Sequence, residues 1–166
     1  MLKKETQSIL LLPDIRSALN VGAIFRTADA VGIDKMYLIG TTPCPNDKFG
    51  RIQKDIAKSA LGAEQFVSWE YKKSLFVLIS KLRRDGFIII ALEQDEKSVD
   101  YRKIKNSFKN KKLPDKVAIV LGQETIGLDK KLLSLCDIIA EIPMHGKKES
   151  LNVSVATGVL LFELLH

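Results

Sequence analysis

The segment Ile142–Ala156 combines residues that could bind a polar or anionic ligand. An apolar strand end runs through a polar, basic loop that includes Lys147 and Lys148, and then into an apolar helix. Backbone N–H groups at the start of a helix lack partners within the helix, so they donate readily to anions and polar ligand groups. Ser150 and Asn152 stand at this junction as candidate site residues. Alternatively, one of them only caps the helix, because Ser and Asn are both favoured N-cap residues.

A second polar cluster lies near the N-terminus, at Asn20–Ala28. Asn20 falls at the expected N-cap of a helix, and Arg26 follows six residues later on the same helix. The arginine could clamp a phosphate group or be an ordinary surface charge.

A third cluster, Val120–Leu128, places Glu124 between Gly122 and Gly127, which indicates a tight turn. Glu124 could contribute to chemistry, or its carboxylate could only accept hydrogen bonds from the amides of its own loop.

Short apolar runs alternate with helix-like stretches and must position these clusters. Ile88–Ala91 and Val117–Leu121 are apolar at successive positions, as expected of strands buried on both faces of a parallel sheet. The alternation predicts an α/β doubly wound domain, in which ligands bind beyond the carboxyl ends of the strands. Each cluster follows a predicted strand, so we expect the clusters to converge. The predicted strands are Ser8–Leu12, Lys35–Ile39, Phe66–Trp69, Phe87–Leu92, Val117–Leu121 and Ile138–Ile142, and the predicted helices are Val21–Ala30, Asp55–Ala60, Leu75–Asp85, Asp129–Leu135 and Leu151–Leu165.

Composition predicts one globular domain over residues 1–166, with 46% hydrophobic and 28% charged residues. No apolar run is long enough for a membrane span, and the first residues turn polar too soon for a secretory signal, so we expect a cytoplasmic protein. Cys44 and Cys136 are too few and too far apart for a disulfide framework, and both are interpreted as packing residues. His145 and His166 show no ligand spacing, so no metal site is expected.

The net charge of +6 favours a polyanionic partner. Seven basic residues and one acid lie between Lys97 and Lys112, with Tyr101 and Phe108 interleaved. This segment could face RNA or be a solvated, mobile linker. The stretch Thr41–Gly50 is interpreted as a surface loop that either contacts substrate or only connects two elements.

Together, the three clusters resemble in order and wording the three motifs of the SpoU (TrmH-like) family of RNA ribose 2′-O-methyltransferases, within the SPOUT class. The likeness runs from about Leu11 to the C-terminus. It implies an α/β SPOUT-type parallel sheet with helices on both faces and a C-terminal deep trefoil knot over about residues 117–166. It also implies S-adenosyl-L-methionine as cofactor. The helix Leu151–Leu165 is apolar nearly all round, which requires deep burial or a subunit interface; the resemblance favours a homodimer.

The resemblance also assigns roles to residues. Arg26 matches the arginine that activates the 2′-hydroxyl, and Asn20, Glu124, Ser150 and Asn152 match the other polar motif positions. Because a guanidinium has a pKa above about 12, we interpret Arg26 as a group that positions the ribose and stabilises the developing alkoxide rather than as a base. Gln123 departs from the asparagine that the family often has. The residues expected to contact the cofactor are Leu92, Leu121, Gly122, Gly127, Ile142, Met144 and Leu151.

The implied activity is RNA 2′-O-methyl transfer, with tRNA as the expected substrate because small members of the family more often resemble tRNA enzymes. Ribosomal RNA is the alternative substrate. A catalytically inactive RNA-binding module is a second alternative, although the three motif residues whose loss would favour it, Arg26, Glu124 and Asn152, are all present. An ordinary dinucleotide-binding fold is disfavoured, since Pro13–Arg16 stands where a glycine-rich turn would follow the first strand.

Overall fold

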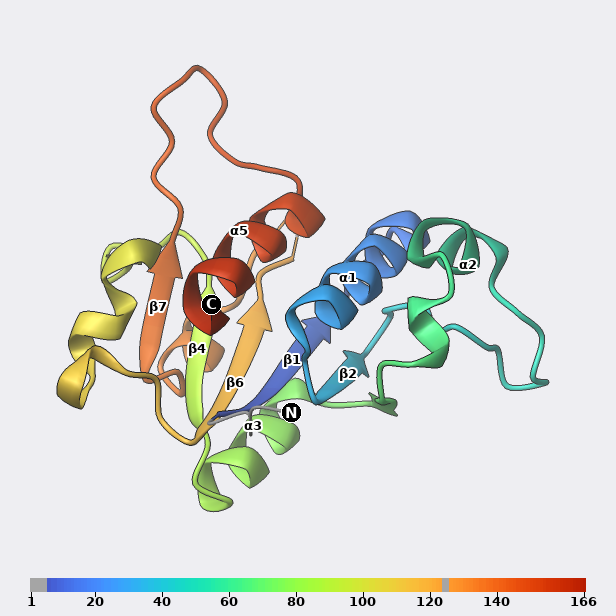
Figure 1. The fold of residues 1–166 in the computed structure, drawn as a ribbon, viewed down its shortest axis with the longest axis horizontal. Helices are drawn as coiled ribbons and strands as arrows, with labels where there is room; N and C mark the ends of the chain where they lie inside the picture. Colours follow the sequence, from blue (N-terminus) through green and yellow to red (C-terminus); the bar gives the residue numbers. More distant parts are fainter. Residues whose placement is uncertain (1–5, 124–125) are drawn as a thin grey trace.

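A seven-stranded, wholly parallel sheet forms the centre of the molecule, with strand order β3-β2-β1-β6-β4-β7-β5 (Figure 1). The computed structural model describes residues 6–123 and 126–166. The strands are β1 (Gln7–Pro13), β2 (Lys35–Ile39), β3 (Trp69–Lys72), β4 (Ile88–Leu92), β5 (Val99–Asp100), β6 (Lys116–Leu121) and β7 (Ile138–Glu141). The helices are α1 (Ala18–Val31), α2 (Lys54–Ala60), α3 (Leu75–Arg84), α4 (Lys130–Leu133) and α5 (Val153–Leu165), with 3₁₀ turns η1 (Ala63–Gln65), η2 (Tyr101–Ser107) and η3 (Lys109–Lys111).

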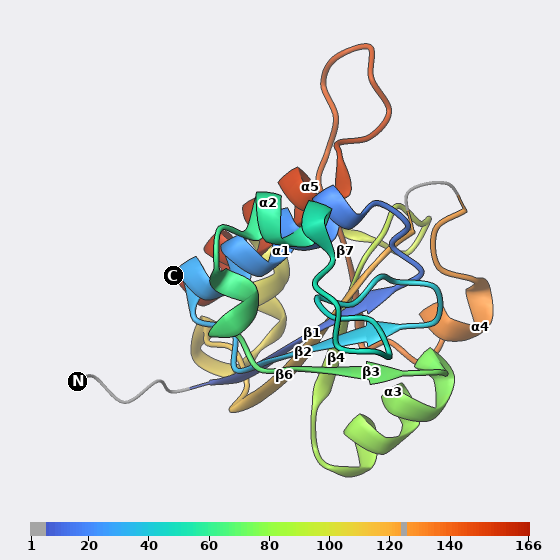
Figure 2. The same ribbon diagram turned by 90° about the vertical axis from the view of Figure 1, so that its right-hand side faces the viewer.

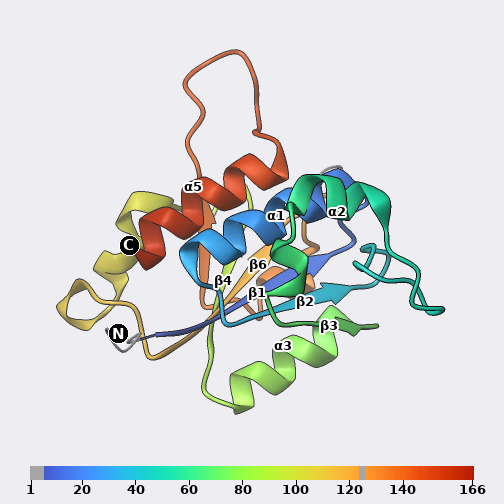
Figure 3. The ribbon, with the colours of Figure 1, turned by 45° about the vertical axis from the view of Figure 1, so that its right-hand side comes forward.

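Helices cover both faces of the sheet, as predicted. Helices α1, α2 and α5 lie side by side on one face, whereas α3 and α4 lie on the other (Figures 2 and 3). Alternate residues of each central strand therefore join different cores. Ile119 of β6 packs in the cluster that contains α1 and α5 residues, and its neighbour Val120 packs in the cluster that contains α3 and α4 residues. Burial on both faces is the physical reason for the continuous apolar runs in the sequence.

The two edge strands differ from the prediction. The predicted strand Phe66–Trp69 is wrong: β3 begins only at Trp69, and Phe66 follows η1 with 79% of its side chain exposed. Strand β5 was not predicted, because two residues paired only with β7 leave no detectable pattern. Edge strands are half-solvated, so they do not show the apolar run that reveals a buried strand.

The basic segment Lys97–Lys112 is folded, so the mobile-linker interpretation is wrong. It forms β5, η2 and η3, and Ile104 within it is fully buried. Tyr101 and Phe108 pack against the core on the α5 side of the sheet. The segment covers the edge of the sheet, with its lysines exposed except for the half-buried Lys105.

Two helix starts bear on the site. Helix α1 begins earlier than predicted and is capped by Ser17, whose Oγ accepts from the N–H of Asn20 at 3.2 Å. The assignment of Asn20 as the N-cap is therefore wrong; Asn20 lies in the first turn. Helix α5 is capped by Asn152, which accepts from the N–H of Ser154 at 2.8 Å.

Within the described ranges, no helix combines the length and apolarity needed to cross a membrane.

Candidate active site

A cavity of about 540 Å³ opens at the carboxyl edge of the sheet. Its walls come from the segments that follow β4, β6 and β7 and from the first turn of α5 (Figure 1). This is where a parallel sheet presents ligand sites. Eight residues expected from the sequence line it: Leu92, Gly122, Gly127, Ile142, Met144, Ser150, Leu151 and Asn152. Leu121 is fully buried at the end of β6 and does not line the cavity.

One wall of the cavity is organised by Glu93, which the sequence analysis did not identify. Its carboxylate accepts from the N–H groups of Gln94 and Leu128, each at 2.9 Å, and so ties the segment after β4 to the segment after β6. A Cβ at Gly122 or Gly127 would overlap that carboxylate. Gly127 also has a φ of 67°, which glycine adopts without strain. The two glycines therefore make room for Glu93 as well as bordering the cavity.

Asn152 joins the first and third polar clusters. Its Oδ1 accepts from Ser154 as the helix cap, which leaves its Nδ2 free to donate to Asn20 Oδ1 at 3.1 Å. Asn152 is thus both a helix N-cap, which was the alternative to a ligand-binding role, and a residue of the cavity wall. The predicted convergence of these two clusters is confirmed through this one contact.

The loop between β7 and α5 projects away from the sheet (Figure 1). The Gln94 side chain holds the end of this loop that leads into α5, because its Nε2 donates to the Glu149 carbonyl at 2.6 Å. This bond brings the segment after β4 against Ser150, the next residue, at the mouth of the cavity. Gln94 is a further lining residue that sequence reasoning missed.

Asp14 connects the cavity to the loop that follows β2. Its Oδ2 accepts from Gln123 Nε2 at 2.9 Å, and its Oδ1 accepts from the N–H of Thr41 at 2.8 Å. Asp14 has a φ of 50°, a left-handed conformation that aspartate tolerates better than most residues. The loops after β6, β1 and β2 are therefore linked by one carboxylate.

The sequence model of the SpoU rRNA Methylase family matches residues 7–162, nearly the whole chain. The chain belongs to this family. A Borreliella burgdorferi protein named as an uncharacterized tRNA/rRNA methyltransferase is 36% identical over 162 residues, which cover 98% of this chain and 65% of that protein. A Neisseria meningitidis protein named 23S rRNA (guanosine-2'-O-)-methyltransferase RlmB is 32% identical over 159 residues, covering 96% and 58%. The chain thus spans less than two thirds of the length of either relative.

The fold of this SpoU family member matches that of a solved relative. The structure described as an AdoMet-bound rRNA methyltransferase from Sinorhizobium meliloti superposes with a TM-score of 0.82 at 29% identity, covering 96% of this chain and 56% of that one. The fold and the family assignment thus agree.

Arg26, which the sequence resemblance places at the active site, is not brought to the cavity of its own chain. It is exposed on α1 and is absent from the lining residues. It lies seven residues after the exposed Leu19, so the two share one stripe of the helix. Glu124 lies outside the described residues.

The cysteines and the other polar groups do not add a second reactive centre among the residues the structure describes. Burial raises the pKa of the Cys44 thiol, and burial also raises the pKa of Cys136 to about 11, so both remain protonated near neutrality. Both cysteines are free. Within residues 6–123 and 126–166, no three His, Cys, Asp or Glu side chains gather as a metal site would require.

Proposed function

We propose that the chain catalyses S-adenosyl-L-methionine-dependent methyl transfer to a ribose 2′-hydroxyl of RNA. The observation that carries the proposal is the 540 Å³ cavity that two family motifs line and the first motif touches through the Asn20–Asn152 contact. The sequence resemblance favours tRNA as substrate, whereas the Neisseria relative is named for 23S ribosomal RNA. Ribosomal RNA is therefore the alternative substrate.

The residues present fit the proposed cofactor. The cavity has the size of a small-molecule site. Leu92, Ile142, Met144 and Leu151 offer apolar surface to the adenine ring and the methionine side chain. The Gly122 N–H already donates to the Leu92 carbonyl at 3.0 Å, so hydrogen bonds to the ribose and the charged ends would come from the polar side chains that line the cavity. When bound, S-adenosyl-L-methionine supplies an electrophilic methyl group on a sulfonium.

This chain's residues would then hold and orient the reacting hydroxyl. Asn152, fixed by its bond to Asn20, presents a polar side chain at the mouth of the cavity. Arg26, with its fork of donors, would bind the phosphate and ribose of the target and stabilise negative charge on the 2′-oxygen as its proton leaves. Ser150 is exposed beside Asn152 and would contact the same polar groups.

We further propose a homodimer in which Arg26 of one subunit reaches the cavity of the other. Leu19, on the same stripe of α1 as Arg26, exposes 48% of its side chain. Val155 and Phe162, seven residues apart on the adjacent α5, expose 52% and 50%. Large apolar side chains on two neighbouring helices favour a covered face. Light scattering checks the assembly, and Phe162→Glu is expected to give monomers that retain the fold and lose methyl transfer.

The proposal includes a trefoil knot over about residues 117–166 and a cytoplasmic location. The knot is supported by family membership, and the location by the nature of the substrate. Mechanical unfolding between the two termini tests the knot, because a tightened knot shortens the fully extended chain relative to its contour length. An extension equal to the full contour length would contradict it.

Methyl-labelled cofactor tests the function directly. The protein is incubated with labelled S-adenosyl-L-methionine and, separately, with total tRNA and ribosomal RNA, and the RNA is digested to nucleosides for mass spectrometry. Label in a 2′-O-methylnucleoside is expected. Cofactor binding without label in either RNA would favour an inactive RNA-binding module.

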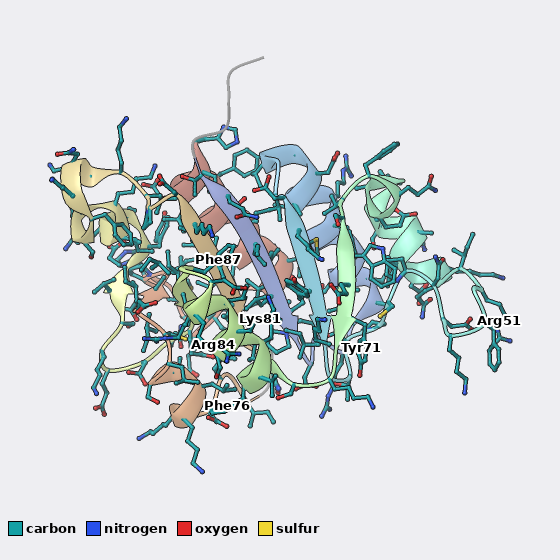
Figure 4. All side chains as sticks on the ribbon, turned by 90° about the horizontal axis from the view of Figure 1, so that it is seen from below. Arg51, Tyr71, Phe76, Lys81, Arg84 and Phe87 are labelled. Carbon is teal, nitrogen blue, oxygen red and sulfur yellow. The ribbon has the colours of Figure 1, made fainter. Side chains whose placement is uncertain are left out.

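Two variant pairs assign the roles. Arg26→Lys is expected to lower kcat about 100-fold without changing cofactor affinity, and Arg84→Lys on the far face of the sheet is its control (Figure 4). Gly122→Ala is expected to weaken cofactor binding at least tenfold, because the new methyl group overlaps the Glu93 carboxylate. Gly146→Ala, with open space around it, is expected to leave binding unchanged. Near-full turnover by Arg26→Lys would refute the bidentate role.

A further inference from the structure

A second cavity lies beside the edge strand β3 and shares no lining residue with the first. It is a groove of about 890 Å³ between the loop that follows β2 and the edge strand β3. Trp69 and Tyr71 of β3 lie on one side of it, and Lys48, Arg51 and Lys54 on the other. We call this the β2–β3 groove.

The loop presents an aromatic ring to solvent beside the groove. Phe49 lies between the lining residues Lys48 and Arg51 in sequence, does not itself line the groove, and exposes 70% of its side chain. Lys48 Nζ and Arg51 Cζ lie 5.0 and 5.2 Å from its ring centroid. Their cation–π contacts orient the ring but do not cover it.

The loop is held in a definite shape rather than left loose. Asp47 accepts from the N–H groups of Phe49 and Arg51, at 2.8 and 3.0 Å, and from Arg51 Nε at 2.7 Å. These contacts occupy the one acidic side chain that lines the groove. Lys48 and Lys54 are not paired with any carboxylate in the described part of the chain, so the groove keeps a positive charge.

The strand side of the groove is also fixed. Trp69 and Tyr71 are two residues apart on β3 and so point to the same face of the strand. Trp69 is half-buried against the core, and the Tyr71 hydroxyl donates to the Gly40 carbonyl at 3.1 Å. Figure 4 shows Tyr71 on β3, Arg51 on the loop beyond it, and Phe76 and Lys81 on α3. Trp69 packs in the core on the α1 side of the sheet, whereas α3 packs in the core on the other side.

Aromatic faces combined with lysine and arginine are the chemistry that binds unpaired nucleotides. Bases of any sequence stack on aromatic rings, and cations hold the phosphates between them. We propose that the β2–β3 groove binds a single-stranded segment of RNA next to the target nucleotide, with one base stacked on Phe49 and its phosphates held by Lys48, Arg51 and Lys54. This inference rests on the proposed function, since it names how that substrate is held.

The placement of the groove suits a strand that also enters the first cavity. Only β1 separates β2 from β6 in the sheet, so the ends of these strands lie about 10 Å apart. Asp14 links the loops that follow them by accepting from Thr41 and Gln123. RNA held in the groove would therefore lie beside a loop bonded to the first cavity.

Trp69 is the chain's single tryptophan and provides a direct test. Short single-stranded RNA is titrated into the intact protein while tryptophan fluorescence is recorded, with affinity measured in parallel by filter retention. We expect RNA to quench Trp69. Phe49→Ala and Phe49→Leu are each expected to weaken RNA affinity at least fivefold, since leucine keeps an apolar side chain but offers no ring for stacking. Cofactor affinity and kcat at saturating RNA should not change.

Matched controls lie on α3. Phe76 is an exposed phenylalanine, and Lys81 forms an i,i+4 ion pair with Asp85 as Arg51 does with Asp47. Phe76→Ala and Lys81→Ala should bind RNA as the wild type does, whereas Arg51→Ala should weaken binding.

The outcomes separate the two proposals. RNA bound without quenching, and with unchanged affinity in the Phe49 variants, would overturn the groove proposal even if methyl transfer is intact. Quenching with the expected variant effects, but no methyl transfer to any RNA, would support the groove and count against the proposed function. Full affinity in Phe49→Leu alone would refute stacking. Failure of the wild-type protein to bind RNA would overturn both.

Discussion

Two basic stretches of this chain look alike in sequence and differ in structure. Residues 97–112 and residues 48–54 both mix lysine or arginine with an aromatic ring. In the first stretch, Tyr101 and Phe108 pack against the core, and most of the cations lie on the solvent-facing side of the segment that covers the sheet edge. In the second, Phe49 is mostly exposed and the cations flank it. Exposure of the ring, and not the density of charge, distinguishes a stacking surface from a solvated face.

The difference follows from how each stretch meets the core. Residues 97–112 contain Ile104, which is fully buried and anchors η2 beneath α5. Residues 48–54 have no such anchor: Ile52 exposes 69% of its side chain. The first stretch is therefore fastened by apolar burial, and the second by the hydrogen bonds of Asp47.

The largest effect is expected when the apolar anchor of residues 97–112 is removed. Ile104→Ala leaves a cavity in the core and is expected to lower the free energy of unfolding by about 3 kcal/mol, which corresponds to about 6–12 °C in Tm, with RNA affinity unchanged. Ile52→Ala should change stability by less than about 0.5 kcal/mol. Thermal unfolding and filter retention measure both variants. The contrast between the two stretches would be contradicted if Ile52→Ala lowered stability, or if Ile104→Ala weakened RNA binding without lowering stability.

Charge removal tests the same contrast through salt dependence. The variant with Lys48, Arg51 and Lys54 all changed to Ala should reduce the slope of log affinity against log salt by about 2, because each phosphate contact to a single strand contributes about 0.7. The matched variant changes Lys103, Lys109 and Lys111 to Ala and should reduce the slope by less than 1. RNA affinity is measured across a salt series. Equal reductions would mean that both stretches contact RNA.

The sequence predicted the centre of the sheet far better than its edges. Strands β4 and β6 are buried on both faces, so their runs of apolar residues are continuous and easily recognised. Strand β3 alternates Trp69 and Tyr71 with Glu70 and Lys72, and it was placed three residues too early because Phe66 and Val67 look more strand-like. Exposure of Phe49 could not be read from the sequence, since the fold of the whole loop decides it.

The candidate site shows the same limit. Gly122, Gly127 and Asn152 were found because motif positions carry over from the family resemblance, and all three line the cavity. Glu93 was missed although it directly follows a predicted strand, which is the position that drew attention to the other polar residues. Asn20 was given the wrong helix position because Ser17 is an equally good cap three residues earlier. Local patterns rank cap candidates poorly when several are present.

Asp14 provides a prediction of intermediate size, since it links Thr41, in the loop that carries the groove residues, to Gln123 of the first cavity. Asp14→Ala removes the acceptor for Thr41 and Gln123 and places alanine at a φ of 50°. We expect about a threefold loss of both RNA and cofactor affinity. Asp95→Ala is the control, because Asp95 also accepts a backbone N–H, that of Lys97 at 2.9 Å, but in the loop before the other basic stretch. Calorimetric titration measures both affinities. Loss of only one of them in Asp14→Ala would show that the two sites are independent.

The smallest effect concerns two sets of ion pairs, those of Glu70 on β3 beside the groove and that of Asp100 with Arg102 in the other basic stretch. Hydrogen bonds from Lys72 and Lys35 lower the pKa of Glu70 to about 2, and Arg102 lowers the pKa of Asp100 to about 2. Glu70 lies between Trp69 and Tyr71, so its pairing fixes the strand side of the groove. A lowered folded-state pKa stabilises the fold above the ordinary value of 4.5, and that contribution is lost as the pH falls toward about 2.

Glu70→Gln should therefore lower the free energy of unfolding at pH 6 by less than about 1 kcal/mol, since the pair is largely solvated, and the difference from wild type should shrink toward pH 2.5. Urea unfolding across this pH range measures it, with Glu96→Gln as a control carboxylate outside the described ion pairs. Because the strand side of the groove would loosen, Glu70→Gln should also reduce Trp69 quenching by RNA slightly at pH 6, whereas Asp100→Asn should not. If Glu70→Gln and Asp100→Asn reduced quenching equally, the effect of RNA on Trp69 would not be specific to the β2–β3 groove.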